Sequence, residues 1–316
     1  MKKKVITLIV FILTSILLLT GCMEEKVKFS LKLKKGDSYR IETGIDQKVV
    51  QEINGKTIEL NSKYNISYSC LVSDVDNNKN ATVQVTFDTI NMKNVVNNGQ
   101  TLEYNSGDPT ANMDNLNRVY SALLGKKFTV KISEDGKIKE ITGIDEVIKS
   151  IITELDIENQ KQRDEIQKVV MEQFGKDALG KKVQNITGAY PDEPVKVGDS
   201  WEKKIEISEE YPIEAESKYT LKERKDEISE VTVASKLKTK EDAKPLILAN
   251  IKINYEFEGT QDGVITVDEE TGITKYVEMN SKYSGTIKFT SDDPNIGAQT
   301  FPISVEAKTI ITISKR

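Results

Sequence analysis

The sequence FPISVEAKTIITI occupies residues 301–313 and alternates apolar with polar side chains over most of its length. Its apolar residues at one parity are Phe301, Ile303, Val305, Ala307, Ile311 and Ile313. Successive side chains of a β-strand point to opposite faces of a sheet, so this pattern predicts a long strand with one dry face and one wet face. Such strands are typical of antiparallel sheets. We therefore expect the chain to fold around long antiparallel strands.

The same alternation recurs upstream. One parity is apolar within residues 251–257, 277–289 and 64–72, and the last of these sets includes Cys70. Asn54-Gly55 separates two apolar stretches and predicts a two-residue hairpin turn. Near the start of the domain, Phe29, Leu31 and Leu33 alternate with lysines and predict one more strand.

Three central segments have apolar residues at helical spacing instead. They are residues 113–124, 144–155 and 159–174. The first begins its apolar stripe at Met113, and Gly125 follows it in the position of a C-terminal cap. We expect three helices in the middle of the chain.

Two turn sequences resemble each other. Lys34–Tyr39 (KKGDSY) is similar to Lys196–Trp201 (KVGDSW), and strand patterns follow both. Gly-Asp-Ser is ordinary turn chemistry, so coincidence explains each match singly, but matches in the same order favour a diverged duplication.

The predicted fold class is α+β, with long antiparallel strands in two related curved β-meanders and a central helical segment. The predicted segments are a signal peptide at 1–21, a lipidated N-terminus and short leader at 22–28, a first β-meander with helices at 29–187 and a second β-meander at 188–316, with the two halves packed as one unit.

The N-terminus has the layout of a secretory signal peptide. Three lysines (Lys2 to Lys4) precede an apolar run over residues 5–19, and the small pair Thr20-Gly21 precedes Cys22. A transmembrane helix is the alternative, but a span needs about 20 apolar residues and this run is shorter. The order Leu19-Thr20-Gly21-Cys22 resembles the bacterial lipobox. That resemblance implies cleavage between Gly21 and Cys22, a diacylglyceryl group with acyl chains such as palmitate on the Cys22 sulfur, and a protein held on the extracytoplasmic face of the cell membrane.

A second resemblance covers most of the mature chain. The two Gly-Asp-Ser-aromatic turns, the sequence KFTV at residues 127–130 and PVKVGDSW at residues 194–201 resemble a family of bacterial lipoproteins of unknown function. A looser likeness in architecture is to lipoprotein carriers and lipid-binding lipoproteins, which wrap a curved antiparallel sheet around helices and an apolar pocket. The abundance of Lys, Glu, Asn and Ile is typical of AT-rich genomes and favours a low-GC Gram-positive source.

The composition excludes some partners. Without the three lysines of the leader the chain has 42 basic and 50 acidic residues, a net charge of −8. No long basic block remains, so nucleic acid and anionic lipid headgroups are poor candidate partners. Cys70 is the one cysteine left besides Cys22, so the mature chain has no intramolecular disulfide, and the parity of Cys70 predicts a buried core position.

Catalytic and metal-binding patterns are weak. The chain has no histidine, which removes Ser-His-Asp and Cys-His nucleophiles and the commonest metal ligand. Residues 74–80 (DVDNNKN) resemble the start of a calcium loop, but Lys79 and Val85 replace the required Gly and Glu, so a hairpin turn is favoured. The acidic groups at residues 268–270 and 292–293 are interpreted as solvated turns, and Trp201 as a packing anchor rather than a ligand contact. We expect no enzymatic activity, no cofactor and no metal.

Two functions remain open from the sequence. The first is a membrane-anchored, non-catalytic binding module for a hydrophobic ligand, held between the curved sheet and the helices. The second is a cell-envelope structural or protein-interaction lipoprotein with a solid core, which pairs with partners through its strand edges. The one-sided strands favour the first slightly, because many apolar faces must be covered by about three helices.

Overall fold

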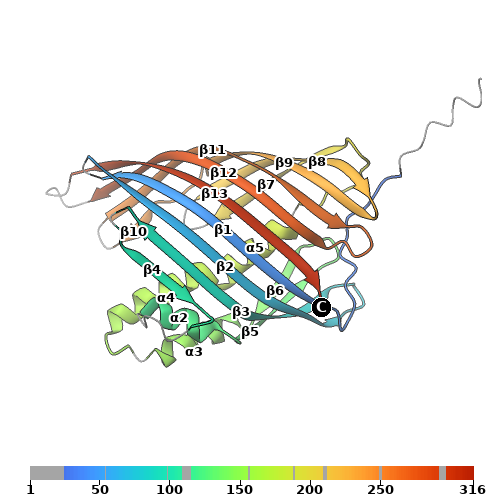
Figure 1. Cartoon of the computed structure of the whole chain (residues 1–316), viewed down its shortest axis with the longest axis horizontal. Helices are drawn as coiled ribbons and strands as arrows, with labels where there is room; N and C mark the ends of the chain where they lie inside the picture. Colours follow the sequence, from blue (N-terminus) through green and yellow to red (C-terminus); the bar gives the residue numbers. More distant parts are fainter. Residues whose placement is uncertain are drawn as a thin grey trace, which may run out of the picture.

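The protein is predominantly β in the computed structural model (Figure 1). The structure describes residues 25–53, 55–97, 99–108, 115–155, 157–187, 189–208, 212–248, 251–291 and 297–316.

All thirteen described strands belong to one antiparallel sheet. The strands of the first half are β1 (Ser38–Ile53), β2 (Lys56–Val75), β3 (Ala81–Val96), β4 (Thr101–Asn105), β5 (Lys127–Ile132) and β6 (Ile138–Thr142). Those of the second half are β7 (Ser200–Ser208), β8 (Ile213–Lys225), β9 (Ile228–Thr239), β10 (Leu246–Leu248), β11 (Ile251–Asp268), β12 (Thr274–Ser291) and β13 (Gln299–Lys315). Along the sheet their order is β6-β5-β3-β2-β1-β13-β12-β11-β9-β8-β7, with β4 beside β3 and β10 beside β11.

The predicted fold class is therefore wrong. The chain does not form an α+β fold with two meanders, because β13 pairs with β12 on one side and with β1 on the other. Ile41 lies opposite Ile313, and Val277 lies opposite Ile311. This C-terminal strand joins both halves into one sheet. Side-chain alternation predicts that a segment is a strand and which face is dry, but it does not say which strand lies beside it.

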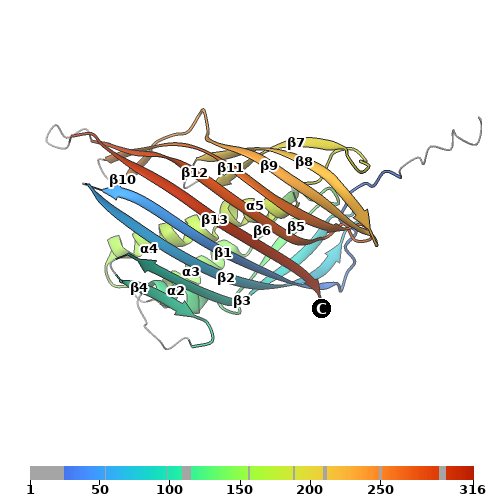
Figure 2. The ribbon, with the colours of Figure 1, turned by 45° about the horizontal axis from the view of Figure 1, so that its top comes forward.

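Four helices of the described chain lie against the inner face of the curved sheet (Figures 1 and 2). They are α2 (Asn115–Leu123), α3 (Ile144–Glu154), α4 (Gln160–Phe174) and α5 (Lys176–Thr187). The first three match the predicted helices, although Met113 lies outside the described residues. Gly125 has φ 74° after α2, and the Asn159 side chain caps α4 by accepting from the Gln162 N–H. No helix in the described part of the chain combines the length and apolar composition that a membrane crossing requires.

Helix α5 is not predicted by the sequence pattern. It contains Gly180 and only a few apolar residues, which gives a weak helical signal. Its position explains the glycine, because a Cβ at Gly180 would approach Ile141 of edge strand β6 to 3.8 Å. The helix contacts β6 and β7, the two edge strands of the sheet, and also β12. It therefore bridges the inner side of the sheet from one edge to the other.

The segment around Phe29, Leu31 and Leu33 is not a strand of the sheet, contrary to the prediction. Residues 27–33, which we call the strap, cross one end of the sheet in an extended conformation. The strap forms an isolated bridge from Val27 to Val195, and it donates from Leu31 N to Glu134 O and from Lys32 N to Thr271 O at 2.8 Å each. Buried apolar side chains and exposed lysines do alternate along the strap. Its backbone hydrogen-bond partners, however, come from three different loops rather than from one strand. We call the end of the sheet with these turns the strap end; it also holds the C-terminus marked in Figure 1.

The two similar turn sequences have the same local structure. In the first, Gly36 has φ 91° and donates to Val72 O at 2.9 Å. In the second, Gly198 has φ 89° and donates to Leu221 O at 2.8 Å. In each turn the aspartate that follows the glycine accepts from the backbone N–H three residues earlier. The sequence similarity therefore corresponds to two structurally equivalent turns, each of which starts a strand.

Candidate functional site

An apolar cavity of about 130 Å³ lies between the sheet, the strap and α5. Two sets of side chains form it. The sheet and the turn before β12 contribute Tyr39, Ile41, Cys70, Val72, Val83, Val85, Val130, Ile132, Ile273, Thr274 and Ile313. The other side consists of Leu31, Leu33, Val183, Ile186, Thr187 and Tyr190. No charged residue is among them. The cavity is thus a gap in the main core at the strap end of the molecule.

The alternation of side chains along β1, β2 and β3 determines which residues of the sheet point into the cavity. Tyr39 lies opposite Cys70 between β1 and β2, and Cys70 lies opposite Val85 between β2 and β3. Residues directly opposite one another share a face, so one row of inward side chains crosses three strands. Cys70 is 5% exposed, which confirms the buried position predicted from its parity. The sequence missed the other side of the wall because neither α5 nor the strap was predicted.

Three polar side chains of the wall have partners in the protein, whereas the buried Tyr39 hydroxyl has none among the described residues. The Thr187 hydroxyl donates to Gly136 O at 2.7 Å, and the Thr274 hydroxyl donates to Ile186 O at 3.2 Å. The Tyr190 hydroxyl donates to Gly272 O. These bonds join α5 and the following loop to two turns of the strap end. They also leave the cavity with a mainly apolar surface, which favours apolar ligands over polar ones.

The titratable groups of the wall are uncharged at neutral pH. Burial, with a smaller effect of the Asp88 charge, raises the pKa of the Cys70 thiol to about 12. Burial also raises the pKa of Tyr190 to about 12. The pKa of Tyr39 is raised by burial and by the negative charge of Asp37. Cys70 is therefore a thiol rather than a thiolate at neutral pH.

The volume of the cavity limits its ligand. Binding pockets for drug-sized molecules measure about 300–1,000 Å³, whereas an apolar cavity of about 150 Å³ holds one benzene molecule. A cavity of about 130 Å³ therefore accommodates a ring or a short branched group. A longer apolar ligand would extend beyond this volume.

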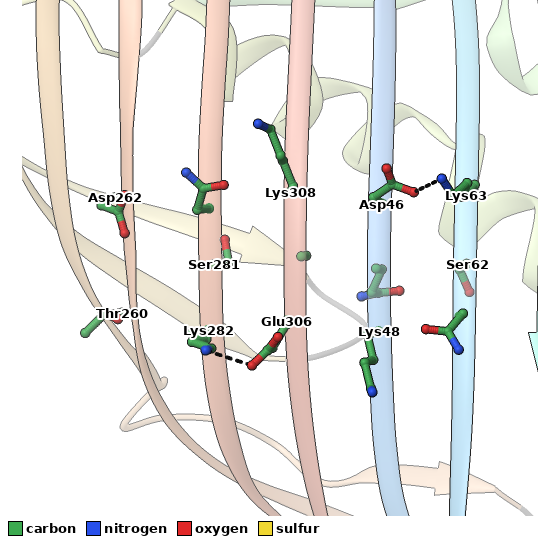
Figure 3. A pocket seen from close by; sticks show the side chains of 14 residues that line it. Asp46, Lys48, Ser62, Lys63, Thr260, Asp262, Ser281, Lys282, Glu306 and Lys308 are labelled. Carbon is green, nitrogen blue, oxygen red and sulfur yellow. Dashed lines mark ion pairs between the residues drawn. The ribbon is translucent and has the colours of Figure 1, made fainter. Parts of the chain in front are cut away.

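A larger hollow of about 490 Å³ lies on the outer face of the sheet (Figure 3). We call it the surface groove. It crosses β2, β1, β13, β12 and β11, and its sides consist of two rows of polar side chains. One row includes Asp46 and Lys63, which form an ion pair of 3.3 Å. The other includes Lys282 and Glu306, whose ion pair measures 2.8 Å.

The chemistry of the surface groove is that of a solvated sheet face. Its ion pairs join neighbouring strands, so they stabilise cross-strand contacts and neutralise one another. Exposed pairs of this kind contribute about 0–1 kcal/mol each. Within the described residues, no group of three or more Asp, Glu, His or Cys side chains is placed to hold a metal ion. The apolar cavity is therefore the stronger candidate site.

Sequence-predicted positions of the N-terminus are not tested by the structure. Gly21 and Cys22 lie outside the described residues, as do Asp292 and Asp293. The lipid attachment at Cys22 and the cleavage after Gly21 therefore stay predictions.

The segment that resembles a calcium loop is a hairpin turn between β2 and β3, as predicted. The Asp76 carboxylate accepts from the backbone N–H groups of Asn78 and Asn80 at 2.9 Å each, and from the Asn80 side chain. Lys131 forms an ion pair with it at 2.9 Å. These hydrogen bonds lower the pKa of Asp76, and they use the oxygens that a calcium ion would need.

Trp201 is a packing anchor, as expected. Its ring stacks on Tyr219 with centroids 5.8 Å apart, and its indole N–H donates to Ala189 O at 2.8 Å. Phe29 of the strap contacts the ring edge-on at 6.4 Å.

One acidic residue at 268–270 differs from the prediction. Glu269 is not a solvated turn residue, because it forms a two-point ion pair with Arg224 at 2.7 and 2.8 Å. The Arg224 guanidinium also donates to the backbone oxygen of Glu25. These residues are far apart in the sequence, so local sequence patterns could not predict their contact.

The family model that matches the chain covers residues 78–274, which is more than half of its length. The chain belongs to the family of unknown function DUF6263. This finding supports the predicted membership of a family without assigned function. The DUF6263 match spans β3 to β6, α2 to α5 and β7 to β11, and so includes α5 and the edge strands β6 and β7 that it contacts. No curated protein matches this DUF6263 chain.

Solved structures resemble this DUF6263 chain only distantly. Lipovitellin, described by its lipid–protein interactions, is similar at 11% identity with a TM-score of 0.47, over 90% of this chain and 25% of its own. The chain thus spans a quarter of the length of that protein. An outer membrane channel from Pseudomonas putida F1 is similar at 6% identity with a TM-score of 0.22, over 90% and 97% of the two chains. OccK5 (OpdH) of Pseudomonas aeruginosa is similar at 7% identity with a TM-score of 0.20, over 89% and 98%.

Proposed function

We propose that this DUF6263 protein is a membrane-anchored, extracytoplasmic lipoprotein that binds a hydrophobic ligand without catalysis. The observation that carries the proposal is the cavity behind the strap, which has an uncharged, mainly apolar wall. Binding of an apolar ligand to such a surface is favourable, because the ligand replaces empty space or poorly bound water and restores dispersion contacts.

The anchor in this proposal rests on Leu19-Thr20-Gly21-Cys22 and the apolar run before it. Two or more acyl chains at Cys22 hold a protein stably on a bilayer, whereas one chain holds it only marginally. The composition favours a Gram-positive bacterium, in which the domain faces the outside of the cell membrane.

The alternative is an envelope lipoprotein that pairs with partners through its strand edges. Helix α5 contacts both edge strands, β6 and β7, which counts against strand addition at these two places. The cavity gives a reason to prefer ligand binding. We therefore retain partner pairing only as the outcome expected if no ligand is found.

Native mass spectrometry tests the proposal. The mature protein, extracted gently from its own membranes, is expected to carry an apolar mass in addition to its lipid anchor. In Val183→Phe the new ring enters the cavity from α5 and should abolish the bound mass. In Gln184→Phe, on the exposed side of the same helix, the bound mass should persist. An unliganded mass for the wild type and both folded variants would contradict ligand binding and favour the alternative.

A further inference from the structure

The strap has two chemically different sides. Val27, Phe29 and Leu31 are 4–9% exposed and pack into the core. The residues before, between and after them include Lys26, Lys28, Lys32, Lys34 and Lys35, all of which are exposed. Because the chain is extended here, alternate side chains point in opposite directions. The strap thus covers the core with its apolar side and presents a row of lysines outward at the strap end.

Three acidic residues near the strap are paired with basic residues outside the lysine row, whereas Lys35 of the row lies 3.7 Å from the Asp74 carboxylate. Glu269 is paired with Arg224, and Asp37 is paired with Lys315 at 2.9 Å. Glu134 is paired with Lys79 at 3.0 Å. Lys26, Lys28, Lys32 and Lys34 therefore give the strap a positive local charge, although the whole chain is acidic.

Hydrogen bonds hold the residues just after Cys22 at the strap end. The Arg224 guanidinium donates to the backbone oxygen of Glu25, and Val27 exchanges two backbone hydrogen bonds with Val195 at 2.7 and 2.9 Å. Three peptide units join Glu25 to Cys22, and these span at most about 11 Å in any conformation. A lipid anchor at Cys22 consequently holds the strap end close to the bilayer.

From these observations we infer that the strap end lies on the surface of an anionic bilayer, with the lysine row against the lipid headgroups. This inference rests on the lipid anchor at Cys22 that is part of the proposed function. It adds the orientation of the domain relative to the membrane. Leu31 and Leu33 line the cavity from the other side of the strap, so the strap lies between the cavity and the bilayer. An apolar ligand dissolved in the membrane then has a short path to the cavity.

Fluorescence quenching on vesicles tests this orientation. The lipidated mature protein, in a Cys70→Ala background, carries an environment-sensitive dye at Glu270→Cys or at Lys56→Cys. Both positions are exposed, the first in the β11–β12 turn at the strap end and the second at the start of β2 at the far end. On vesicles of phosphatidylcholine and phosphatidylglycerol with a headgroup-attached quencher, we expect at least twofold stronger quenching at position 270 than at position 56.

Charge variants separate the lysine row from the anchor. The combined Lys26→Gln, Lys28→Gln and Lys34→Gln variant should lose at least half of the quenching at position 270, while it still sediments fully with the vesicles. The matched variant Lys63→Gln, Lys282→Gln and Lys308→Gln, on the surface groove, should leave that quenching unchanged. Equal quenching at both positions, or no response to the strap substitutions, would overturn the orientation. Failure of the wild type to sediment would show instead that the anchor is absent, and the orientation would fall with it.

Discussion

The Thr187 hydroxyl, in the last turn of α5, donates a hydrogen bond to the carbonyl oxygen of Gly136 at 2.7 Å. This bond joins the helix to the β5–β6 turn beside the cavity. Gly136 has φ 78°, and a Cβ there would lie 3.0 Å from both the Cβ and the carbonyl oxygen of Thr187. The turn and the helix end therefore fit closely only because residue 136 is a glycine. The position of α5, and with it one wall of the cavity, depends on this contact.

Gly136→Ala should lower the free energy of unfolding by about 2–4 kcal/mol, because it adds a steric contact to the cost of a left-handed backbone. Gly36→Ala is the matched control, since Gly36 has φ 91° but no atom within 4 Å of the added Cβ. The control should cost about 1–2 kcal/mol, which is the conformational part alone. Urea denaturation measures both values. Equal losses would mean that Thr187 does not hold α5 against this turn.

Cys70 should react slowly and should make stability pH-dependent. Burial raises its pKa to about 12, so the unfolded state loses the thiol proton at a lower pH than the folded state does. The unfolded state then binds fewer protons, and stability falls as pH rises from about 8.5 towards 12, by at most about 1.4 kcal/mol per pH unit for this one group.

Two measurements check the state of Cys70. Thiol labelling at pH 8 should be at least about 100-fold slower in the folded protein than in denaturant, because both burial and the low thiolate fraction oppose it. Urea titrations between pH 8 and 10.5 should show a shallower fall of stability in Cys70→Ala than in the wild type. Rapid labelling of the native protein would place the thiol outside the core.

The Arg224–Glu269 pair should stabilise the strap end at neutral pH. Hydrogen bonds from Arg224 come first among the causes that lower the pKa of Glu269, and both side chains are largely buried. A lowered pKa means that this stabilisation is present above the unfolded pKa of about 4.3 and is lost as pH falls below it. Glu269→Gln should therefore cost about 1–2 kcal/mol at pH 7 and much less at pH 3. Glu230→Gln, which removes the more exposed pair with Lys222, should cost less than about 0.5 kcal/mol. A loss in Glu269→Gln that is the same at both pH values would argue against the ion pair.

Cys22→Ser should remove the anchor. Without the sulfur there is no atom to carry the diacylglyceryl group, so the protein should either leave the membrane or accumulate with its leader uncut. Fractionation and the mass of the N-terminal peptide distinguish these states from the wild type. Unchanged membrane retention with normal cleavage would contradict lipidation. Cys70→Ser, with no expected effect on location, serves as the control.

Much of the secondary structure could be predicted from the sequence, since the signals are local. Strands β12 and β13, the helix that begins at Ile144 and the turns at Gly36 and Gly198 all follow from side-chain period and turn chemistry. The arrangement of these elements could not be predicted in the same way. The pairing of β13 with β1 joins the two ends of the chain, and no local pattern encodes it.

The candidate site was predicted in part. The parity of Cys70 indicated its inward position, which lies in the cavity wall. The opposite wall was missed for two physical reasons. Helix α5 has few apolar residues and an internal glycine that fits against Ile141, and the strap alternates like a strand although it bonds to loops. The Arg224 contact with Glu25 was hidden because 199 residues separate them.

The central claim, that the cavity behind the strap holds an apolar ligand, is tested most directly by ligand uptake. The mature protein is stripped of bound lipid, incubated with the lipid extract of the source membrane and re-isolated, and the extractable apolar mass is measured per mole of protein. We predict about one mole per mole for the wild type and for Gln184→Phe, and at least fivefold less for Val183→Phe. Equal uptake by all three proteins, or none by the wild type, would contradict the claim.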